Sequence, residues 1–176
     1  MSQRTRKQIC SLVLLSVLAS GCVSVDKRAW NESVSAGFTL NVSDRFLVRS
    51  PYDSQNLAEV LGLSNARLTE TVSVSFDKQK GLVLRFEVDE TEVLSKTYTR
   101  EDGLETTSDG KIQLRKTTDC GTGDAPAIGC VTSTTTLFVN PDRDLIIVKS
   151  IYGAGLYTII PLGGYSESFA KFPRKR

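Results

Sequence analysis

The sequence contains no histidine. Ser-His-Asp and Cys-His catalysis, histidine ligation of a metal and imidazole-based pH switching are therefore excluded. Cysteine is scarce, with four in 176 residues, and there is a single tryptophan, Trp30. No apolar run approaches the roughly 20 residues that a transmembrane helix requires. The absence of histidine leaves open hydrolysis by two carboxylates that meet in the fold, but no spacing in the sequence supports such a pair. We expect a protein that is not an enzyme, with no catalytic residue, no cofactor and no metal.

The first 21 residues have the order of a secretory signal peptide. Residues 4–7 carry three basic side chains, residues 9–19 are apolar except for two serines, and residues 19–21 are small. The apolar segment has about 11 positions, well short of a bilayer-spanning helix, so a retained membrane helix is not expected.

Cys22 comes directly after Gly21, and residues 18–22 resemble the lipobox of bacterial lipoproteins. That pattern prefers leucine three positions before the cysteine, where this chain has Ala19, with Leu18 one position earlier. The resemblance implies signal cleavage between Gly21 and Cys22, a thioether from Cys22 to diacylglycerol, and acylation (palmitate, for example) of the new N-terminus. The alternative is an ordinary signal peptide with Cys22 as a buried thiol.

Two or more acyl chains anchor a protein stably where one is marginal, so the resemblance implies a membrane-attached protein. Val23 follows the cysteine, where aspartate would favour retention in the inner membrane. The resemblance therefore implies the cell envelope, with delivery to the outer membrane and the protein facing the periplasm.

The balance of basic and acidic residues after the signal peptide argues against a nucleic acid partner. Residues 1–21 hold three of the 22 basic residues and none of the 20 acidic ones, which leaves 19 basic and 20 acidic side chains from Cys22 onward. Because nucleic-acid-binding proteins carry an excess of basic residues, we expect no nucleic acid partner.

Cys10 belongs to the signal peptide and Cys22 is the expected lipidation site, which leaves two cysteines. They are Cys120 and Cys130, and because the exported compartment is oxidising we expect them to form a disulfide. Closing a loop of this size stabilises the fold by roughly 2.5–3 kcal/mol in the chain-entropy model. The alternative, a two-thiolate metal site, lacks CxxC spacing and further soft ligands.

The sequence as a whole indicates four parts. Residues 1–21 are the signal peptide, residues 22–36 a lipidated N-terminus and tether, residues 37–170 a single β-rich domain, and residues 171–176 a basic tail. About 155 residues is an ordinary length for one domain.

Alternating apolar and polar residues predict strands through most of the β-rich domain. The pattern is clearest over 72–76 and 82–88, residues 38–42 form the first predicted strand, and residues 156–160 form the last, ended by Pro161. Residues 145–151 are apolar on both faces, which is typical of a central strand.

Between these strands, Asp102-Gly103 and Asp109-Gly110 are hairpin turn signals. The prediction is an all-β fold with minor α content, an antiparallel meander of about 8–9 strands that closes toward a barrel or packs as a sandwich.

One short helix is predicted near residues 54–61. Asp53 or Ser54 can cap its start, Leu57, Val60 and Leu61 have helical spacing, and Gly62 suits its end.

Several polar groups and glycines suggest binding chemistry, but each has a simpler structural interpretation. Asp89, Glu90 and Glu92 could hold a cation, although acidic residues at a hairpin tip also protect sheet edges. Residues 140–144 (Asn140, Asp142, Asp144) have the spacing that starts a calcium loop, yet Leu145 replaces the required glycine and Ile151 the final glutamate. Gly153–Gly155 and Gly163–Gly164 lack a phosphate-cradling pattern and are interpreted as turn or bulge glycines.

The polar face at Thr132, Thr134 and Thr136 is either ordinary sheet surface or a ladder of ligand-contacting hydroxyls. The basic tail is either a solvated end or a contact with anionic headgroups or cell-wall polymer.

The leading functional hypothesis is a non-catalytic binding domain that engages another envelope component, a protein, in an accessory, inhibitor or immunity-type role. The membrane is the second partner, through the N-terminal acyl chains. The alternative is a carrier of a hydrophobic small ligand in a barrel-like cup, which needs an apolar cavity of at least about 300 Å³. The sequence indicates no oligomeric state.

Overall fold

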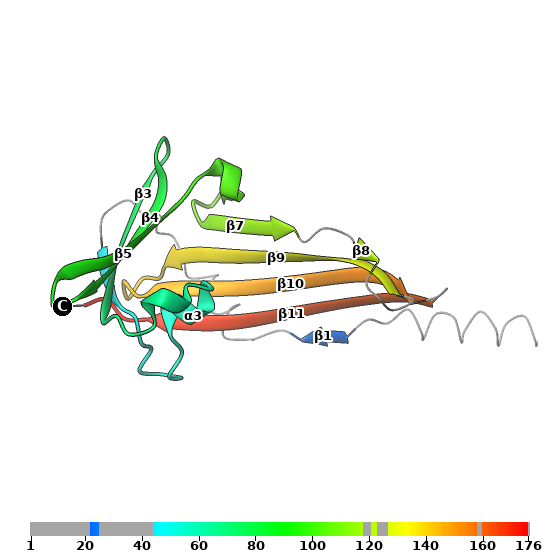
Figure 1. Ribbon diagram of the computed structural model, residues 1–176, viewed down its shortest axis with the longest axis horizontal. Coiled ribbons are helices and arrows are strands. Elements are labelled where there is room, and N and C mark those ends of the chain that lie inside the picture. Colours follow the sequence, from blue (N-terminus) through cyan, green and yellow to red (C-terminus); the bar gives the residue numbers. More distant parts are fainter. Residues whose placement is uncertain (1–21, 25–43, 118–120, 123–126, 158–159, 176) are drawn as a thin grey trace, which may run out of the picture. The chain divides into compact units, whose positions relative to one another are not determined.

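The structure is a computed structural model that describes residues 22–24, 44–117, 121–122, 127–157 and 160–175 (Figure 1). Within these residues the chain is all-β with one short α-helix, as predicted. The strands form a seven-stranded sheet, in the order β1-β11-β10-β9-β7-β6 with β8 paired to β9, and a four-stranded sheet in the order β2-β3-β4-β5. Neither sheet closes into a barrel, so the sandwich is the better of the two predicted architectures.

The strands of the four-stranded sheet are β2 (Asp44–Leu47), β3 (Thr71–Asp77), β4 (Gly81–Val88) and β5 (Thr91–Tyr98). The strands of the seven-stranded sheet are β1 (Cys22–Ser24), β6 (Leu104–Thr106), β7 (Ile112–Thr117), β8 (Gly121–Thr122), β9 (Ala127–Val139), β10 (Leu145–Tyr157) and β11 (Ile160–Phe172). The helices are α3 (Leu57–Val60) and the 3₁₀ turns η1 (Ser64–Ala66) and η2 (Arg100–Asp102).

The chain divides into two compact units rather than the single domain expected over 37–170. The hairpin unit contains β1, β8 and the described parts of 127–133, 150–157 and 160–167. The sandwich unit contains residues 44–116, 134–149 and 168–175. Strands β9, β10 and β11 contribute one part to each unit, and the two units are described separately below.

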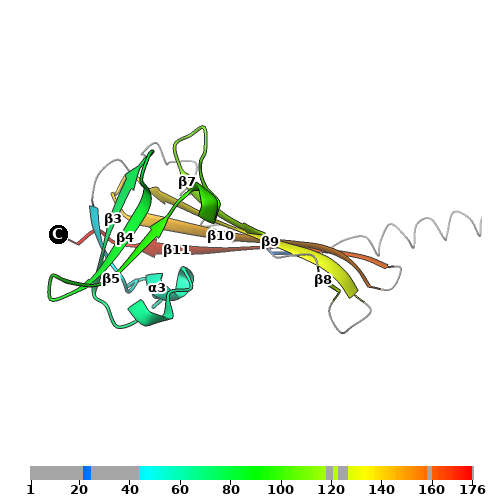
Figure 2. The same ribbon diagram turned by 45° about the horizontal axis from the view of Figure 1, so that its top comes forward.

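Figure 2 shows the strands of the four-stranded sheet, which form because apolar and polar residues alternate along them. Val72 of β3 pairs with Phe46 of β2 on one side and with Phe86 of β4 on the other, and all three side chains are fully buried. Because side chains alternate across a strand, this register puts one apolar face on the core and leaves the other polar.

The core of the sandwich unit is formed by side chains from both sheets and from α3. The four-stranded sheet supplies residues such as Leu82 and Leu84, the seven-stranded sheet supplies residues such as Leu145 and Ile147, and α3 supplies Leu57. Each is at most 1% exposed. Burying one such side chain contributes about 1.5–3 kcal/mol, so this shared cluster holds the two layers together.

The opposite face of the seven-stranded sheet is also buried in the sandwich unit. Phe138, Ile146, Val148 and Phe169 form a second apolar cluster on the side chains that alternate with those of the main core. Strand β10 lies between β9 and β11. The prediction that 145–151 is a central strand with two apolar faces is confirmed over its first residues.

The segment after β11 pairs with the edge strand of the other sheet. Pro173 accepts a hydrogen bond from the backbone N–H of Leu47 at 2.9 Å, and the N–H of Lys175 donates to the carbonyl of Arg45 at 2.9 Å. Arg174 lies 2.8 Å from the buried carboxylate of Asp44. The interpretation of 171–176 as a basic tail is therefore wrong for residues 171–175, because the apolar Phe172 and the Asp44 charge hold them in the fold.

The short helix is where the sequence predicts it, but its cap differs. Asn56, not Asp53 or Ser54, accepts hydrogen bonds from the backbone of Ala58 at 2.9 Å and Glu59 at 3.4 Å. Asn56 also donates to the carbonyl of Arg67 at 2.9 Å, so the cap ties the helix to η1. The prediction of residues 53 and 54 used only the neighbouring residues, and they do not reveal this second bond because its partner lies 11 residues away.

Strands β10 and β11 are longer than predicted. The glycines at 153–155 and 163–164 lie within strands, and Pro161 is the second residue of β11 rather than the end of a strand. Proline is tolerated at the start of a strand, and glycine where backbones approach closely. A Cβ at Gly129 would lie 3.2 Å from the carbonyl oxygen of Ala154, which is such an approach.

The predicted tether over 22–36 begins with a strand instead. Cys22–Ser24 forms β1 and pairs in parallel with β11, with Cys22 opposite Gly164. The remainder of that segment and the predicted first strand at 38–42 lie outside the described residues.

Candidate functional site

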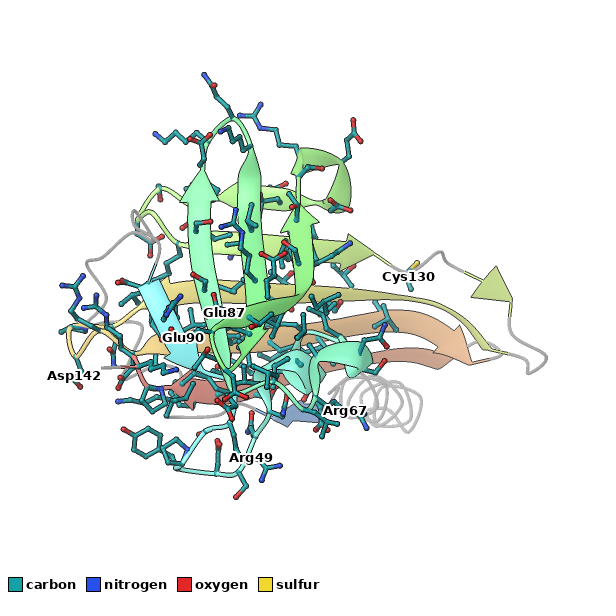
Figure 3. The ribbon with its side chains drawn as sticks, turned by 60° about the vertical axis from the view of Figure 1, so that its left-hand side comes forward. Arg49, Arg67, Glu87, Glu90, Cys130 and Asp142 are labelled. Carbon is teal, nitrogen blue, oxygen red and sulfur yellow. The ribbon has the colours of Figure 1, made fainter. Side chains whose placement is uncertain are left out.

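The residues predicted from the lipobox and the cysteine count are partly within the structure. The backbone of Cys22 is placed by its pairing with Gly164, whereas Gly21 lies outside the described residues. Cys130 lies on β9 and is labelled in Figure 3. Its sulfur is in a disulfide bond. Cys120, its predicted partner, lies outside the described residues, so the Cys120–Cys130 pairing stays a prediction.

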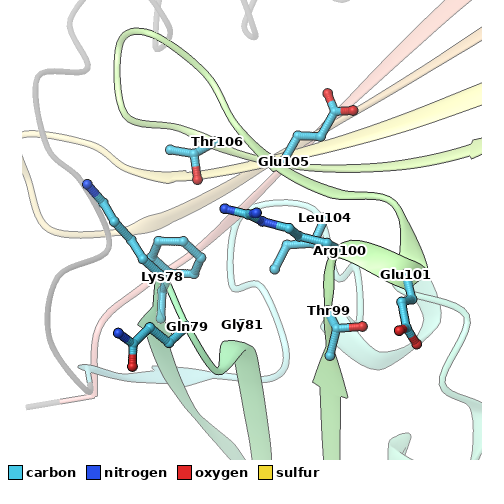
Figure 4. A pocket seen from close by; sticks show the side chains of 10 residues that line it. Lys78, Gln79, Gly81, Thr99, Arg100, Glu101, Leu104, Glu105 and Thr106 are labelled. Carbon is cyan, nitrogen blue, oxygen red and sulfur yellow. The ribbon is translucent and has the colours of Figure 1, made fainter.

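One concave feature of the sandwich unit is a groove of about 1120 Å³ that is open to solvent (Figure 4). It lies between the β3–β4 turn, the end of β5 with η2, and β6. We call it the rim groove; its lining residues are Phe76, Lys78, Gln79, Gly81, Thr99, Arg100, Glu101, Leu104, Glu105 and Thr106.

One wall of the rim groove is held in place by Asp77. Its carboxylate accepts hydrogen bonds from the backbone N–H groups of Lys80 at 3.0 Å and Gln79 at 2.7 Å. These bonds favour the charged form and lower the pKa of Asp77. The turn that carries Lys78 and Gln79 is thereby fixed by a single side chain.

The facing wall is held by a capping box at η2. Asp102 accepts hydrogen bonds from the backbone N–H of Thr99 at 2.8 Å and from its hydroxyl at 3.1 Å. The same two bonds, the backbone one first, lower the pKa of Asp102. Arg100 and Glu101 project from this fixed turn.

The floor of the rim groove is apolar and tightly packed. A Cβ at Gly81 would lie only 2.1 Å from the carbonyl oxygen of Tyr98 and 3.5 Å from Leu104 Cδ2, so no other residue fits without movement. Leu104 is 6% exposed and belongs to the main core. Burial raises the pKa of Tyr98, whose ring has the ammonium of Lys96 at 5.2 Å from its centroid.

Two basic side chains that line the rim groove have no ion-pair partner among the described residues. Among the described residues, neither Lys78 nor Arg100 is within ion-pair distance of a carboxylate; the paired basic residues are Arg45, Arg67, Arg85, Lys111, Arg143, Lys171 and Arg174. The side chains of Lys78 and Arg100 extend into the space between the walls, whereas Glu101 and Glu105 point away from it (Figure 4). An anionic group in the rim groove would meet two cations that form no ion pair among the described residues.

The acidic groups singled out in the sequence are used within the fold. Glu90 and Glu92 lie 3.7 and 3.6 Å from Arg45 and Arg85, and Glu90 is shown beside the buried Glu87 in Figure 3. Asp89 and Glu90 have positive φ and form the tight β4–β5 turn.

In the segment 140–144, which has only the initial spacing of a calcium loop, Asn140 Oδ1 accepts the N–H of Asp144 at 2.8 Å. The ammonium of Lys171 lies 3.3 Å from Asp144 and 3.8 Å from Asp142, so a lysine supplies the positive charge there. Within the described residues no group of three or more acidic or cysteine side chains is placed to hold a metal ion.

One hydroxyl of the polar face at Thr132, Thr134 and Thr136 has a hydrogen-bond partner in the fold. The hydroxyl of Thr136 accepts a hydrogen bond from the side-chain amide of Gln113 at 3.3 Å.

A second, smaller cavity of about 220 Å³, bounded by residues such as Gln55, Glu59 and Lys149, is below the size of ordinary ligand sites.

The rim groove was missed in the sequence. Its three segments are separated by up to 30 residues, and only the sheet order brings them together. The available signal was local: Asp77 lies three residues before Lys80, and Asp102 lies directly before Gly103, which predicts ordered turns but not their common location.

Comparison of the chain with models of protein families, with curated proteins and with solved structures found no match. Among the described residues, none of the helices has the length and apolar character needed to cross a membrane.

Proposed function

We propose that the protein is a lipid-anchored lipoprotein of the cell envelope, attached to the outer membrane through Cys22 and facing the periplasm. Its sandwich unit is a non-catalytic binding module, and its partner is another envelope protein that engages the rim groove. An accessory, inhibitor or immunity-type role fits such a module.

The observation that carries the binding proposal is the composition of the rim groove. An apolar floor of Phe76 and Leu104 is surrounded by charged and hydroxyl side chains, and two of them, Lys78 and Arg100, are unpaired among the described residues. A small apolar centre with a polar rim is the usual anatomy of a protein–protein contact, in which arginine is enriched.

The chemistry of the groove also suggests which feature of the partner it binds. An acidic side chain placed between Lys78 and Arg100 would replace two hydrated cations by charge-assisted hydrogen bonds, while a neighbouring apolar side chain covers Phe76. We therefore infer a partner segment that carries an acidic residue next to an apolar one.

The alternative, a carrier of a hydrophobic ligand, is less well supported. The rim groove exceeds the roughly 300 Å³ that a small ligand needs, but ligand cavities enclose most of the ligand and are lined mainly by apolar side chains. This groove is open and has four charged side chains in its lining.

Site-specific photo-crosslinking in intact cells tests the proposal. A photoreactive residue at Gln79 or Thr106, both in the rim groove, should give a discrete protein adduct. Leu68, which is 93% exposed and outside the groove, is the matched control. The adduct should weaken when Lys78→Glu and Arg100→Glu are combined. An adduct yield from Gln79 no higher than from Leu68, or one unaffected by the charge reversals, would contradict it.

A further inference from the structure

The hairpin unit exposes large apolar side chains. Val131 of β9 is 44% exposed, and Ile151 and Tyr152 of β10 are 37% and 57% exposed. Because successive residues of a strand point to opposite faces, Ile151 and Tyr152 expose apolar surface on both faces of this unit. One flat protein partner could cover only one face of such a sheet, whereas a membrane interface can surround both faces.

One long stretch of the hairpin unit is free of charge. From Ser150 to Ser166 there is no charged residue, although 24% of the whole chain is charged. This run contains three tyrosines, the side chain that is enriched, with tryptophan, at membrane–water interfaces because one end is apolar and the other polar. Charged residues, which would resist the apolar side of that interface, begin again only at Glu167.

The strand pairing places the anchor residue next to this surface. Cys22 of β1 pairs with Gly164 of β11, and β11 separates β1 from β10 (Figure 1). A Cβ at Gly163 would lie 3.7 Å from the carbonyl oxygen of Gly153, so Tyr152 and Gly164 are near neighbours across β10 and β11. With strands about 4.8 Å apart, the backbone of Cys22 lies about 10 Å from that of Tyr152.

We propose that Val131, Ile151 and Tyr152, which we call the hairpin surface, lie in the headgroup region of the bilayer that holds the acyl chains of Cys22. This inference rests on the proposed lipidation of Cys22. The acyl chains enter the membrane about 10 Å from Tyr152, so the bilayer is the partner present at the highest local concentration. The hairpin unit is then in contact with the membrane rather than held away from it by a tether.

Fluorescence of the full-length lipidated protein in vesicles of phosphatidylethanolamine and phosphatidylglycerol tests this contact. Trp30→Phe removes the natural tryptophan, and Tyr152→Trp and Val131→Trp place single reporters on β10 and β9. Tyr52→Trp is the matched control, because Tyr52 is 63% exposed but belongs to the sandwich unit. We expect blue-shifted emission and loss of more than half the intensity for both reporters when the lipid chains carry bromine, and no change for the control.

The outcomes separate this inference from the proposed function. An acylated Cys22, shown by mass, with both reporters emitting as in detergent-free buffer would overturn the membrane contact and leave the anchor in place. Quenching of one reporter alone would overturn the two-sided contact. A free thiol at Cys22 would overturn both proposals. An unchanged circular dichroism spectrum for each variant shows that the reporters have not unfolded the sheet.

Discussion

Replacing Gly81 with alanine tests how the floor of the rim groove is built. Gly81 has φ +94°, and an added Cβ would lie 2.1 Å from the carbonyl oxygen of Tyr98. Tyr98 is also paired in register with Leu82, so the paired ends of β4 and β5 must separate to make room. Gly81→Ala therefore combines an unfavourable backbone conformation with a backbone clash.

The expected loss follows from these two effects. A left-handed conformation disfavours alanine by about 1–2 kcal/mol. Moving the Tyr98 carbonyl away weakens a ladder hydrogen bond, which is worth about 0.5–1.5 kcal/mol. We expect Gly81→Ala to lower the free energy of unfolding by about 1.5–3.5 kcal/mol in total.

Gly62→Ala is the matched control. Gly62 also has positive φ, at +73°, but nothing lies within 4 Å of the position of its Cβ. This variant should lose only the conformational part, about 1–2 kcal/mol. Urea unfolding of the two purified mature proteins measures the difference, and the crosslinking yield from Gln79 should fall for Gly81→Ala alone. Equal destabilisation by the two variants would refute the close contact at the groove floor.

Four further outcomes are expected. Cys22→Ser should abolish palmitate incorporation and leave an uncleaved precursor; labelling equal to the parent would contradict the anchor. Reduction should lower the free energy of unfolding by about 2.5–3 kcal/mol if Cys120 and Cys130 are paired, and a Cys120→Ser variant should then be insensitive to reductant. Arg174→Ala should destabilise the protein by about 1–3 kcal/mol, because it removes a charge-assisted bond to the buried Asp44, whereas Lys175→Ala should have little effect. Hydrogen bonds from the Thr107 hydroxyl and then from Lys111 lower the pKa of Asp109 from 3.8 to about 2, so its contribution to stability is complete above pH 4 and is lost as the pH falls toward 2. Asp109→Asn should remove that part of the acid titration, and an unchanged acid unfolding curve would argue against it.

The sequence predicted those parts of the fold that depend on local pattern. The alternation over 72–76 and 82–88 gave β3 and β4 because one face of each strand is buried against the other sheet. The helix at 57–60 was predicted from the spacing of its apolar residues and from Gly62, which has the positive φ that ends it.

Predictions failed where distant partners decide the structure. The basic residues near the C-terminus resemble a solvated tail, yet Arg174 forms an ion pair with Asp44, about 130 residues earlier in the chain. The glycines at 153–155 resemble a turn, but they lie in β10 because adjacent backbones pass close to them. Neither partner can be identified from a short window of sequence.

The candidate site shows the same limit. Asp77 and Asp102 mark ordered turns in the sequence, whereas the order β2-β3-β4-β5 and the path through η2 to β6 decide that Lys78 and Arg100 face one groove. The acidic residues considered as cation ligands in the sequence form ion pairs within the fold instead. Their partners are Arg45, Arg85 and Lys171.

The chemical state of Cys22 in protein purified from membranes is the most direct measurement, because membrane attachment and the hairpin surface both depend on it. Mass spectrometry of the N-terminal peptide should find Cys22 as the first residue, carrying diacylglycerol on its sulfur and an acyl chain on its amino group. A peptide that still contains Gly21, or a free thiol at Cys22, would contradict the proposed anchor.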